Sequence, residues 1–104
     1  MIIQISTDKT LKGAKNQVDF FSTQIAKELE RFESHITRIE VHLKDENGIK
    51  EGFNEISCLL EARLEGKQPI AVKNQADTVE LAISGATSKV KAAIKTIVGR
   101  SQNR

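Results

Sequence analysis

Two histidines and one cysteine are the side chains of this 104-residue sequence best suited to metal binding or nucleophilic chemistry. His35 follows a predicted helix, and His42 lies on the polar side of a predicted strand. No cysteine or second histidine stands at metal-ligand spacing from either one, so we interpret both as surface residues and expect no metal site. Cys58 lies in an apolar run. Because a reactive thiol needs a nearby cation and some exposure, we expect Cys58 to be a buried core residue.

Signatures of known catalytic chemistry are missing from the sequence. It contains no P-loop, no GxGxxG, no nucleophile elbow and no HExxH motif. Glu40, Glu55 and Glu61 lie on the polar side of predicted strands, and no pattern encloses two of them in a pocket with opposed environments. We therefore expect no enzymatic activity, no small-molecule substrate and no cofactor.

Basic residues concentrate towards the end of the sequence. The formal net charge is +2, but residues 77–104 carry +3 and residues 36–64 carry −2. At about 100° per residue, Lys91 and Lys95 lie together on the last predicted helix, with Lys89 and Arg100 on the other flank of its apolar stripe. Outward cations on a helix can lie along an RNA backbone, where electrostatics supply most of the affinity.

The first predicted helix carries a second candidate RNA-binding face. Its outward residues follow each other at steps of four, three and four, and the connection before it adds further lysines: Phe20, Gln24, Lys27, Arg31, and then Lys9, Lys12 and Lys15. An outward aromatic ring can stack on a base while the cations meet phosphates. In the alternative, the ring folds over the core edge and the cations pair with Glu28, Glu30 or Glu33. Spacing alone favours this second interpretation.

Two periodicities predict the elements that position these side chains. Alternation of apolar and polar residues indicates strands over residues 2–6, 39–44, 53–64 and about 68–75. Apolar steps of three and four indicate helices over about 16–34 and 77–99. The order is β-α-β-β-β-α. We expect a two-layer α+β fold, with two helices on one face of a four-stranded mixed sheet, similar to a double-stranded-RNA-binding domain. The first two strands should be parallel, and the others should form an antiparallel meander.

Local signals predict how these elements begin and end. Residues 16–19 and 77–80 resemble capping boxes, residues 65–66 suit a tight hairpin turn, and Gly99 should stop the last helix. The other face of the sheet should remain wet, and its residues are Arg38, Glu40, His42, Glu55, Ser57, Glu61 and Arg63. We expect one domain over residues 1–104, with a core of about 1–99 and a frayed tail at 100–104.

Composition also bounds the location of the protein. No stretch approaches the roughly 20 apolar residues of a membrane span. A single cysteine excludes an internal disulfide framework and fits a reducing compartment. We therefore expect a cytoplasmic protein that does not bind membranes.

Several runs of residues resemble the hibernation-promoting factor and ribosome-associated inhibitor A family, also known as sigma-54 modulation proteins. The resemblance covers essentially the whole chain. It rests on ERF at 30–32, ITRIEVHL at 36–43, DENG at 45–48, CLLEARLEG at 58–66, QPIAV at 68–72 and AD at 76–77. The last helix adds Ala82, Ala86, Lys89 and Val90 at family-like places.

The resemblance implies a bacterial protein that binds the small ribosomal subunit and its 16S rRNA, where it occupies the channel for messenger and transfer RNA and blocks translation. Matching positions of the family's binding surface are Lys89, Lys91 and Lys95, with Lys27 and Arg31 on the first helix. Arg100, Lys12, Lys15 and Phe20 extend this surface. We expect a monomer away from the ribosome. The alternative is a small protein-interaction or stress-adaptor domain without RNA binding, possibly a homodimer through its open sheet face.

Overall fold

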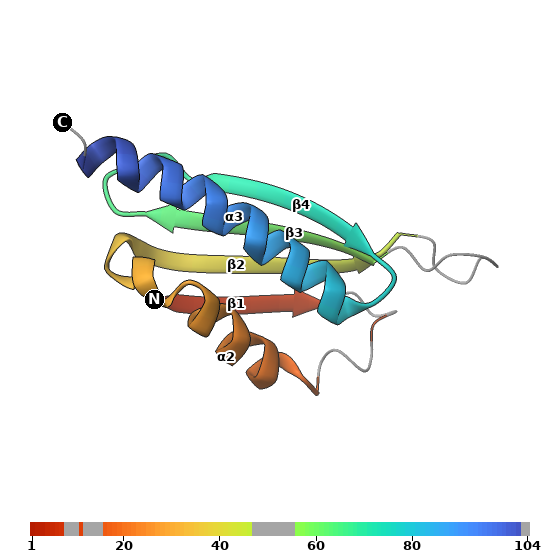
Figure 1. Cartoon of the computed structure of the whole chain (residues 1–104). Helices are drawn as coiled ribbons and strands as arrows, with labels where there is room; N and C mark the ends of the chain where they lie inside the picture. Colours follow the sequence, from red (N-terminus) through yellow and green to blue (C-terminus); the bar gives the residue numbers. More distant parts are fainter. Residues whose placement is uncertain (8–10, 12–15, 47–55, 103–104) are drawn as a thin grey trace.

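The computed structural model describes residues 1–7, 11, 16–46 and 56–102 and contains the predicted β-α-β-β-β-α order. The elements in chain order are β1 (Ile2–Thr7), α2 (Val18–Glu28), a 3-10 helix η1 (Glu30–His35), β2 (Ile36–Asp45), β3 (Ile56–Leu64), β4 (Ile70–Ala76) and α3 (Val79–Gln102) (Figure 1). The α+β fold class is confirmed. The predicted start of the third strand at Phe53 lies outside the described residues.

One four-stranded mixed sheet holds the strands in the order β1-β2-β3-β4. β1 is parallel to β2, whereas β2, β3 and β4 form an antiparallel meander, as predicted. A parallel pair needs a crossover connection, and α2 and η1 lie within that crossover. Since β4 is an edge strand, Pro69 just before it removes no ladder hydrogen bond from the centre of the sheet.

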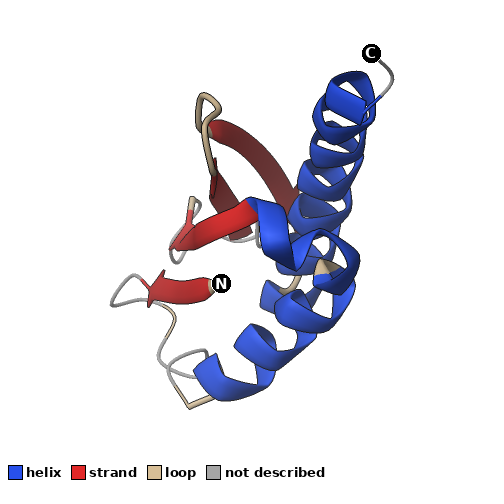
Figure 2. Ribbon diagram, turned by 90° about the vertical axis from the view of Figure 1, so that its left-hand side faces the viewer, coloured by secondary structure: helices blue, strands red, loops and turns tan. Residues whose placement is uncertain are grey.

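Both helices cover the same face of the sheet, which confirms the predicted two-layer arrangement (Figure 2). The residues at the centre of the core have at most 2% of their surface exposed and come from β2, β3 and both helices: Phe21, Ile25, Leu29, Ile39, Val41, Cys58, Leu60, Ile83, Val90 and Ile94. Cys58 is thus a core residue, as expected. Truncating such a side chain to alanine costs about 2–5 kcal/mol, so this layer fixes where the helices sit.

The first helix is shorter than predicted, because α2 ends at Glu28 and a 3-10 helix follows it. Leu29 N still donates to Ile25 O at 3.0 Å, but Phe32 N donates to Leu29 O at 2.9 Å, a bond to the third residue back. Residues three apart eclipse each other in a 3-10 helix. The tighter winding therefore buries Leu29 and Phe32 on one line, and the predicted apolar stripe survives the change of helix type.

The predicted helix caps are also corrected. Residue Gln17 occupies the N-cap of α2 and forms no side-chain cap hydrogen bond, so the box expected at residues 16–19 does not form. The cap of α3 lies one residue later than expected: Leu81 N donates to Thr78 Oγ1 at 3.1 Å, and Ala82 N donates to Thr78 O at 2.9 Å. The threonine hydroxyl thus satisfies a backbone donor that the helix itself leaves unpaired.

Gly99 does not end the last helix, which continues to Gln102 and so takes in part of the predicted tail. A glycine ends a helix when it adopts a left-handed conformation. Gly66 is the residue with positive φ in the described part of the chain, so Gly99 keeps a helical backbone.

The connection between β3 and β4 is longer than a two-residue hairpin. Lys67 N donates to Leu64 O at 3.3 Å, which closes a turn around Gly66 with its φ of 72°. That φ favours glycine at this position. Strand β4 begins only at Ile70, so the expected tight turn is present but three further residues separate it from the strand.

A close contact between Asn74 and Gly85 fixes α3 against β4. The Asn74 side-chain amide donates to Ala82 O at 3.2 Å and lies near Leu81 O at 3.4 Å. A Cβ atom at Gly85 would stand 2.1 Å from Asn74 Nδ2, far inside normal contact distance. Glycine is therefore required here by the close approach of the strand and not by its own backbone conformation.

Candidate nucleic-acid interface

A surface groove of about 760 Å³ separates α2 and η1 from α3 on the side of the helices that faces away from the sheet. Its floor contains Ile25 and Ile83. Its polar lining comes from both helical segments: Gln24, Lys27, Glu28, Glu30, Arg31, Ser84, Thr87 and Lys91. Three cations and two carboxylates therefore meet in one groove, drawn from segments about 60 residues apart in the sequence.

Burial of the apolar stripe of α2 positions the cations of the groove. Because Phe21, Ile25 and Leu29 point into the core, Lys27 is exposed at the groove. Arg31 lies in η1 with its guanidinium carbon 5.5 Å from the centre of the Phe32 ring. A guanidinium near an aromatic ring loses less freedom when it binds a phosphate, since the ring already limits its motion.

The expected pairing of the first-helix cations with neighbouring glutamates is not what the structure contains. Within the described residues, neither Lys27 nor Arg31 has a carboxylate within 4.0 Å. The glutamate of α2 that does form an ion pair is Glu28, and its partner is Lys91 of α3, with Nζ and Oε2 3.2 Å apart. This pair spans the groove.

The remaining lysines of α3 lie on two sides of that helix. Lys95 is exposed one turn beyond Lys91, and no carboxylate of the described chain lies within ion-pair distance of it. Lys89 points towards the edge of the sheet, where its Nζ donates to Lys73 O at 2.8 Å beside a small hollow that also includes Asn74 and Gln75. The two flanks expected from helical spacing are thus present.

Phe20 projects from the first turn of α2 with 56% of its surface exposed, so it does not fold over the core edge. Its ring meets Phe21 edge-on, with centroids 5.5 Å apart. It is not among the residues that line the groove. Lys12 and Lys15 lie outside the described residues, and for Arg100 the structure gives only its place in α3.

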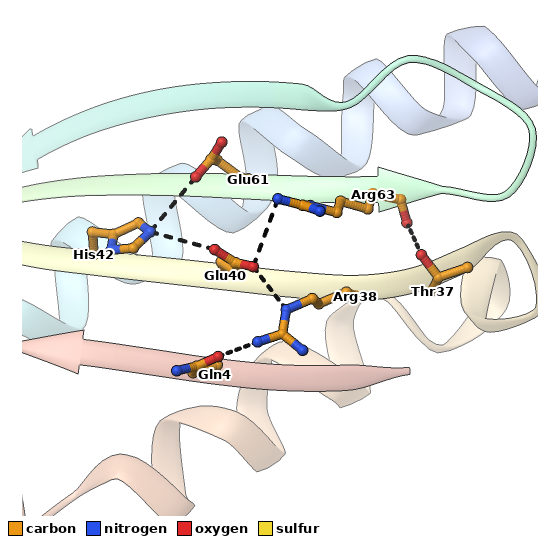
Figure 3. Close-up of polar contacts among 7 residues, drawn as sticks. All are labelled: Gln4, Thr37, Arg38, Glu40, His42, Glu61 and Arg63. Carbon is orange, nitrogen blue, oxygen red and sulfur yellow. Dashed lines mark hydrogen bonds and ion pairs between the residues drawn. The ribbon is translucent and has the colours of Figure 1, made fainter.

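The sheet face away from the helices carries a polar network centred on Glu40 (Figure 3). Arg38 Nε donates to Glu40 Oε2 at 2.7 Å and also binds the Gln4 side chain, while Arg63 approaches the same carboxylate to 4.0 Å. The hydrogen bond from Arg38 holds the pKa of Glu40 below its ordinary value of 4.5, with further help from the charges of Arg38, Arg63 and His42 and against a smaller effect of desolvation.

His42 belongs to this network, because its Nε2 lies 3.8 Å from Glu40 Oε1 and 3.6 Å from Glu61 Oε1. Sequence spacing missed this group, which depends on Glu40 and Glu61 being register partners on β2 and β3. The three ligand atoms lie within 4.8 Å of one another, a set that can hold a divalent ion. Two guanidinium groups beside Glu40 oppose a further cation, so we interpret the group as a cross-strand ion-pair network.

Two other expectations for this face and the core are now tested. Ser57, expected to be wet, is only 4% exposed, because its short side chain stands between the longer Lys44 and Gln75, its register partners. Glu55 lies outside the described residues. Burial raises the pKa of the Cys58 thiol to about 12, which leaves it protonated and unreactive at neutral pH. No helix within the described ranges has the length and apolar character needed to cross a membrane.

Comparison with known protein families matches residues 14–102 to the family described as sigma 54 modulation protein / S30EA ribosomal protein. The chain belongs to this family. The match covers most of the chain and confirms the resemblance that the sequence runs indicate. The family is one of ribosome-associated, hibernation-type proteins and not of enzymes. A comparison with curated protein sequences gave no match.

Solved structures from this family share the fold. The N-terminal domain of Protein Y from Thermus thermophilus aligns with a TM-score of 0.71 at 14% identity, over 93% of this chain and 99% of that chain. A ribosomal subunit interface protein from Coxiella burnetii aligns with a TM-score of 0.66 at 13% identity, over 95% and 99% respectively. At such low identity these likenesses establish the four-stranded sheet with two helices on one face, and no residue roles.

Proposed function

We propose that this protein binds the small ribosomal subunit through the exposed side of its two helices and occludes the channel for messenger and transfer RNA. The observation that carries the proposal is the groove between α2 and α3. There Lys27 and Arg31, which have no carboxylate partner in the described chain, stand opposite Lys91. Family membership supplies the partner, since the related proteins are associated with ribosomes.

The proposed contact is with phosphates of the ribosomal RNA. Lys27, Arg31, Lys91 and Lys95 form the helical binding face, and Lys89 adds a contact on the sheet side of α3. Five such phosphate contacts correspond to a slope of log affinity against log salt of about −3.5 to −4.5. Arg100, Lys12, Lys15 and the exposed Phe20 ring extend the surface in this proposal, the ring by stacking on an unpaired base.

Occlusion of the channel would follow from the position of the domain and not from any reaction. The helical face holds the RNA, and the sheet behind it fills space that messenger RNA needs. The open sheet face, with its cations already paired to carboxylates, would then face away from the RNA. No covalent step and no cofactor takes part.

Co-sedimentation with purified bacterial small subunits tests this proposal, with large subunits as the control for nonspecific binding. We expect the protein to pellet with small subunits in 50 mM salt and to be released between 200 and 400 mM salt, a window of about the width that phosphate contacts give. The bound protein should also displace a fluorescent messenger RNA from the subunit. Protein that stays in the supernatant at 50 mM salt, or equal pelleting with large subunits, would contradict it.

The adaptor interpretation makes a different prediction for the same sample. A homodimer through the open sheet face would show twice the mass of the chain in light scattering and no co-sedimentation with either subunit. Leu59, 38% exposed, is the large apolar residue on the β3 part of that face, between Ser57 and Glu61. A face of this composition offers little apolar area to a dry interface.

A further inference from the structure

We propose that Glu28 is an internal competitor for the RNA phosphate that Lys91 binds, so that the ion pair across the groove limits the affinity of the helical face. This inference rests on the proposed function and adds its regulation by a residue of the chain itself. Glu28 Oε2 and Lys91 Nζ are 3.2 Å apart, and their side chains are 54% and 39% exposed. Both groups are therefore reachable by an RNA backbone that enters the groove.

Three observations distinguish this pair from an ordinary surface contact. First, it joins two helices across the groove, whereas Lys27 and Arg31 of the same groove have no carboxylate within ion-pair distance in the described chain. Lys91 is therefore the cation of the groove lining that a carboxylate already holds. A phosphate that binds Lys91 must first displace Glu28.

Second, the position of Glu28 in α2 gives the helix no benefit from its negative charge. Glu28 is the last residue of α2, where the helix dipole favours cations and disfavours carboxylates. The charge of Glu28 is thus balanced by Lys91 and not by its own helix. Replacing Glu28 by glutamine keeps the shape of the side chain and removes a charge that α2 does not need.

Third, displacement of Glu28 leaves its carboxylate next to the incoming phosphate. Glu28 then weakens binding twice, because it occupies Lys91 before binding and repels the phosphate afterwards. It must also take up a solvent cation as the RNA gives one up, which reduces the net counterion release. The wild-type protein is expected to show a shallower salt dependence than its number of cations implies.

The matched control lies in the same groove. Glu30 also lines it, carries the same charge, and has no cation within ion-pair distance in the described chain. E28Q and E30Q therefore change the net charge by the same amount, and only E28Q releases Lys91. A difference between the two variants measures the ion pair and not the overall charge.

The experiment measures binding of full-length protein to purified small subunits by fluorescence anisotropy between 50 and 300 mM salt, for wild type, E28Q, E30Q, K91M and E28Q/K91M. We expect E28Q to bind about threefold to tenfold more tightly than wild type, with a salt slope steeper by about 0.7–0.9. E30Q should change affinity less than about twofold and leave the slope unchanged. In the K91M background, E28Q should have no more effect than E30Q.

Each outcome decides between the inference and the proposed function. If wild type binds and E28Q behaves like E30Q, Glu28 does not compete for Lys91, and this inference is wrong while the proposed function stands. An undiminished effect of E28Q in the K91M background also overturns it. If no variant binds small subunits, both the proposed function and this inference fail. Thermal melting of each variant confirms that it is folded.

Discussion

The two faces of the protein treat their charges in opposite ways. On the open sheet face, Arg38, Arg63 and His42 each lie within 4.0 Å of a carboxylate, and Glu40 is shared among them. On the helical face, Lys27 and Arg31 lack such a partner in the described chain. The difference shows why a net charge of +2 says little about RNA binding, since pairing and not number decides which cations are available.

Geometry explains the difference. Neighbouring strands place side chains directly opposite each other, so Glu40 and Glu61 meet in register and attract the cations beside them. The helices are joined to each other through the core and leave a groove between their outer sides, where long side chains can reach past each other into solvent. The sheet face is thereby neutralised internally, and the helical face keeps charge for a partner.

The largest effect is expected from reversing the free cations of the helical face. K27E/R31E should weaken binding to small subunits about 100-fold or more in 100 mM salt and reduce the salt slope by about two, one for each lost phosphate contact. The matched change on the other face is K44E, at an exposed position of β2. Equal losses in both variants, measured by fluorescence anisotropy, would show that only the total charge matters.

The next effect concerns the support of α3 on the sheet. G85A should destabilise the protein by about 1–3 kcal/mol, because its Cβ would stand 2.1 Å from Asn74 Nδ2. In the N74A background the same substitution should be neutral or stabilising, since the clash is gone and alanine favours a helix by about 0.5–1 kcal/mol. Urea denaturation of the four proteins measures the coupling. Additive effects would mean that the strand and the helix do not lock each other.

A smaller effect is expected from acid on the open sheet face. Because the folded-state pKa of Glu40 is lowered, its contribution to stability is complete above the ordinary pKa of 4.5 and is lost as the pH falls through the folded-state value. E40Q should therefore lower the melting temperature at pH 7 and differ little from wild type near pH 3. E30Q, on the other face, serves as the control. A difference between E40Q and wild type that is constant from pH 7 to pH 3 would contradict the assignment.

The smallest effect concerns the core layer between the two faces. With its pKa raised to about 12 and none of its surface exposed, the Cys58 thiol should not react with Ellman's reagent at pH 8 in the native protein. One equivalent should react after the addition of guanidinium chloride. Rapid reaction of the native protein would show that the layer between helices and sheet opens locally.

Much of this architecture follows from periodicity in the sequence, because burial on one face imposes a period of two on strands and of 3.6 on helices. Local details were predicted less well. The change to a 3-10 helix at Glu30 leaves the stripe from Phe21 to Phe32 buried, so the apolar pattern does not reveal it. Gly99 was misinterpreted because a glycine marks a helix end only when it adopts a left-handed backbone.

The candidate site was predicted in its residues and missed in its pairing. Helical spacing correctly turned Lys27 outward and brought Lys91 and Lys95 onto one flank. The ion pair between Glu28 and Lys91 joins residues 63 positions apart, and the group of Glu40, His42 and Glu61 depends on strand register. Contacts of that kind depend on how the elements pack, which no local pattern encodes.

The most direct test of the account is to ask which face of the wild-type protein the small subunit covers. Lysine acetylation followed by mass spectrometry, with and without small subunits, compares both faces in one sample. We expect Lys27, Lys91 and Lys95 on the helices to be protected in the complex, and Lys44 on the open sheet face to react as in the free protein. Protection of Lys44 with unchanged reactivity of Lys27, Lys91 and Lys95 would contradict binding through the helical face.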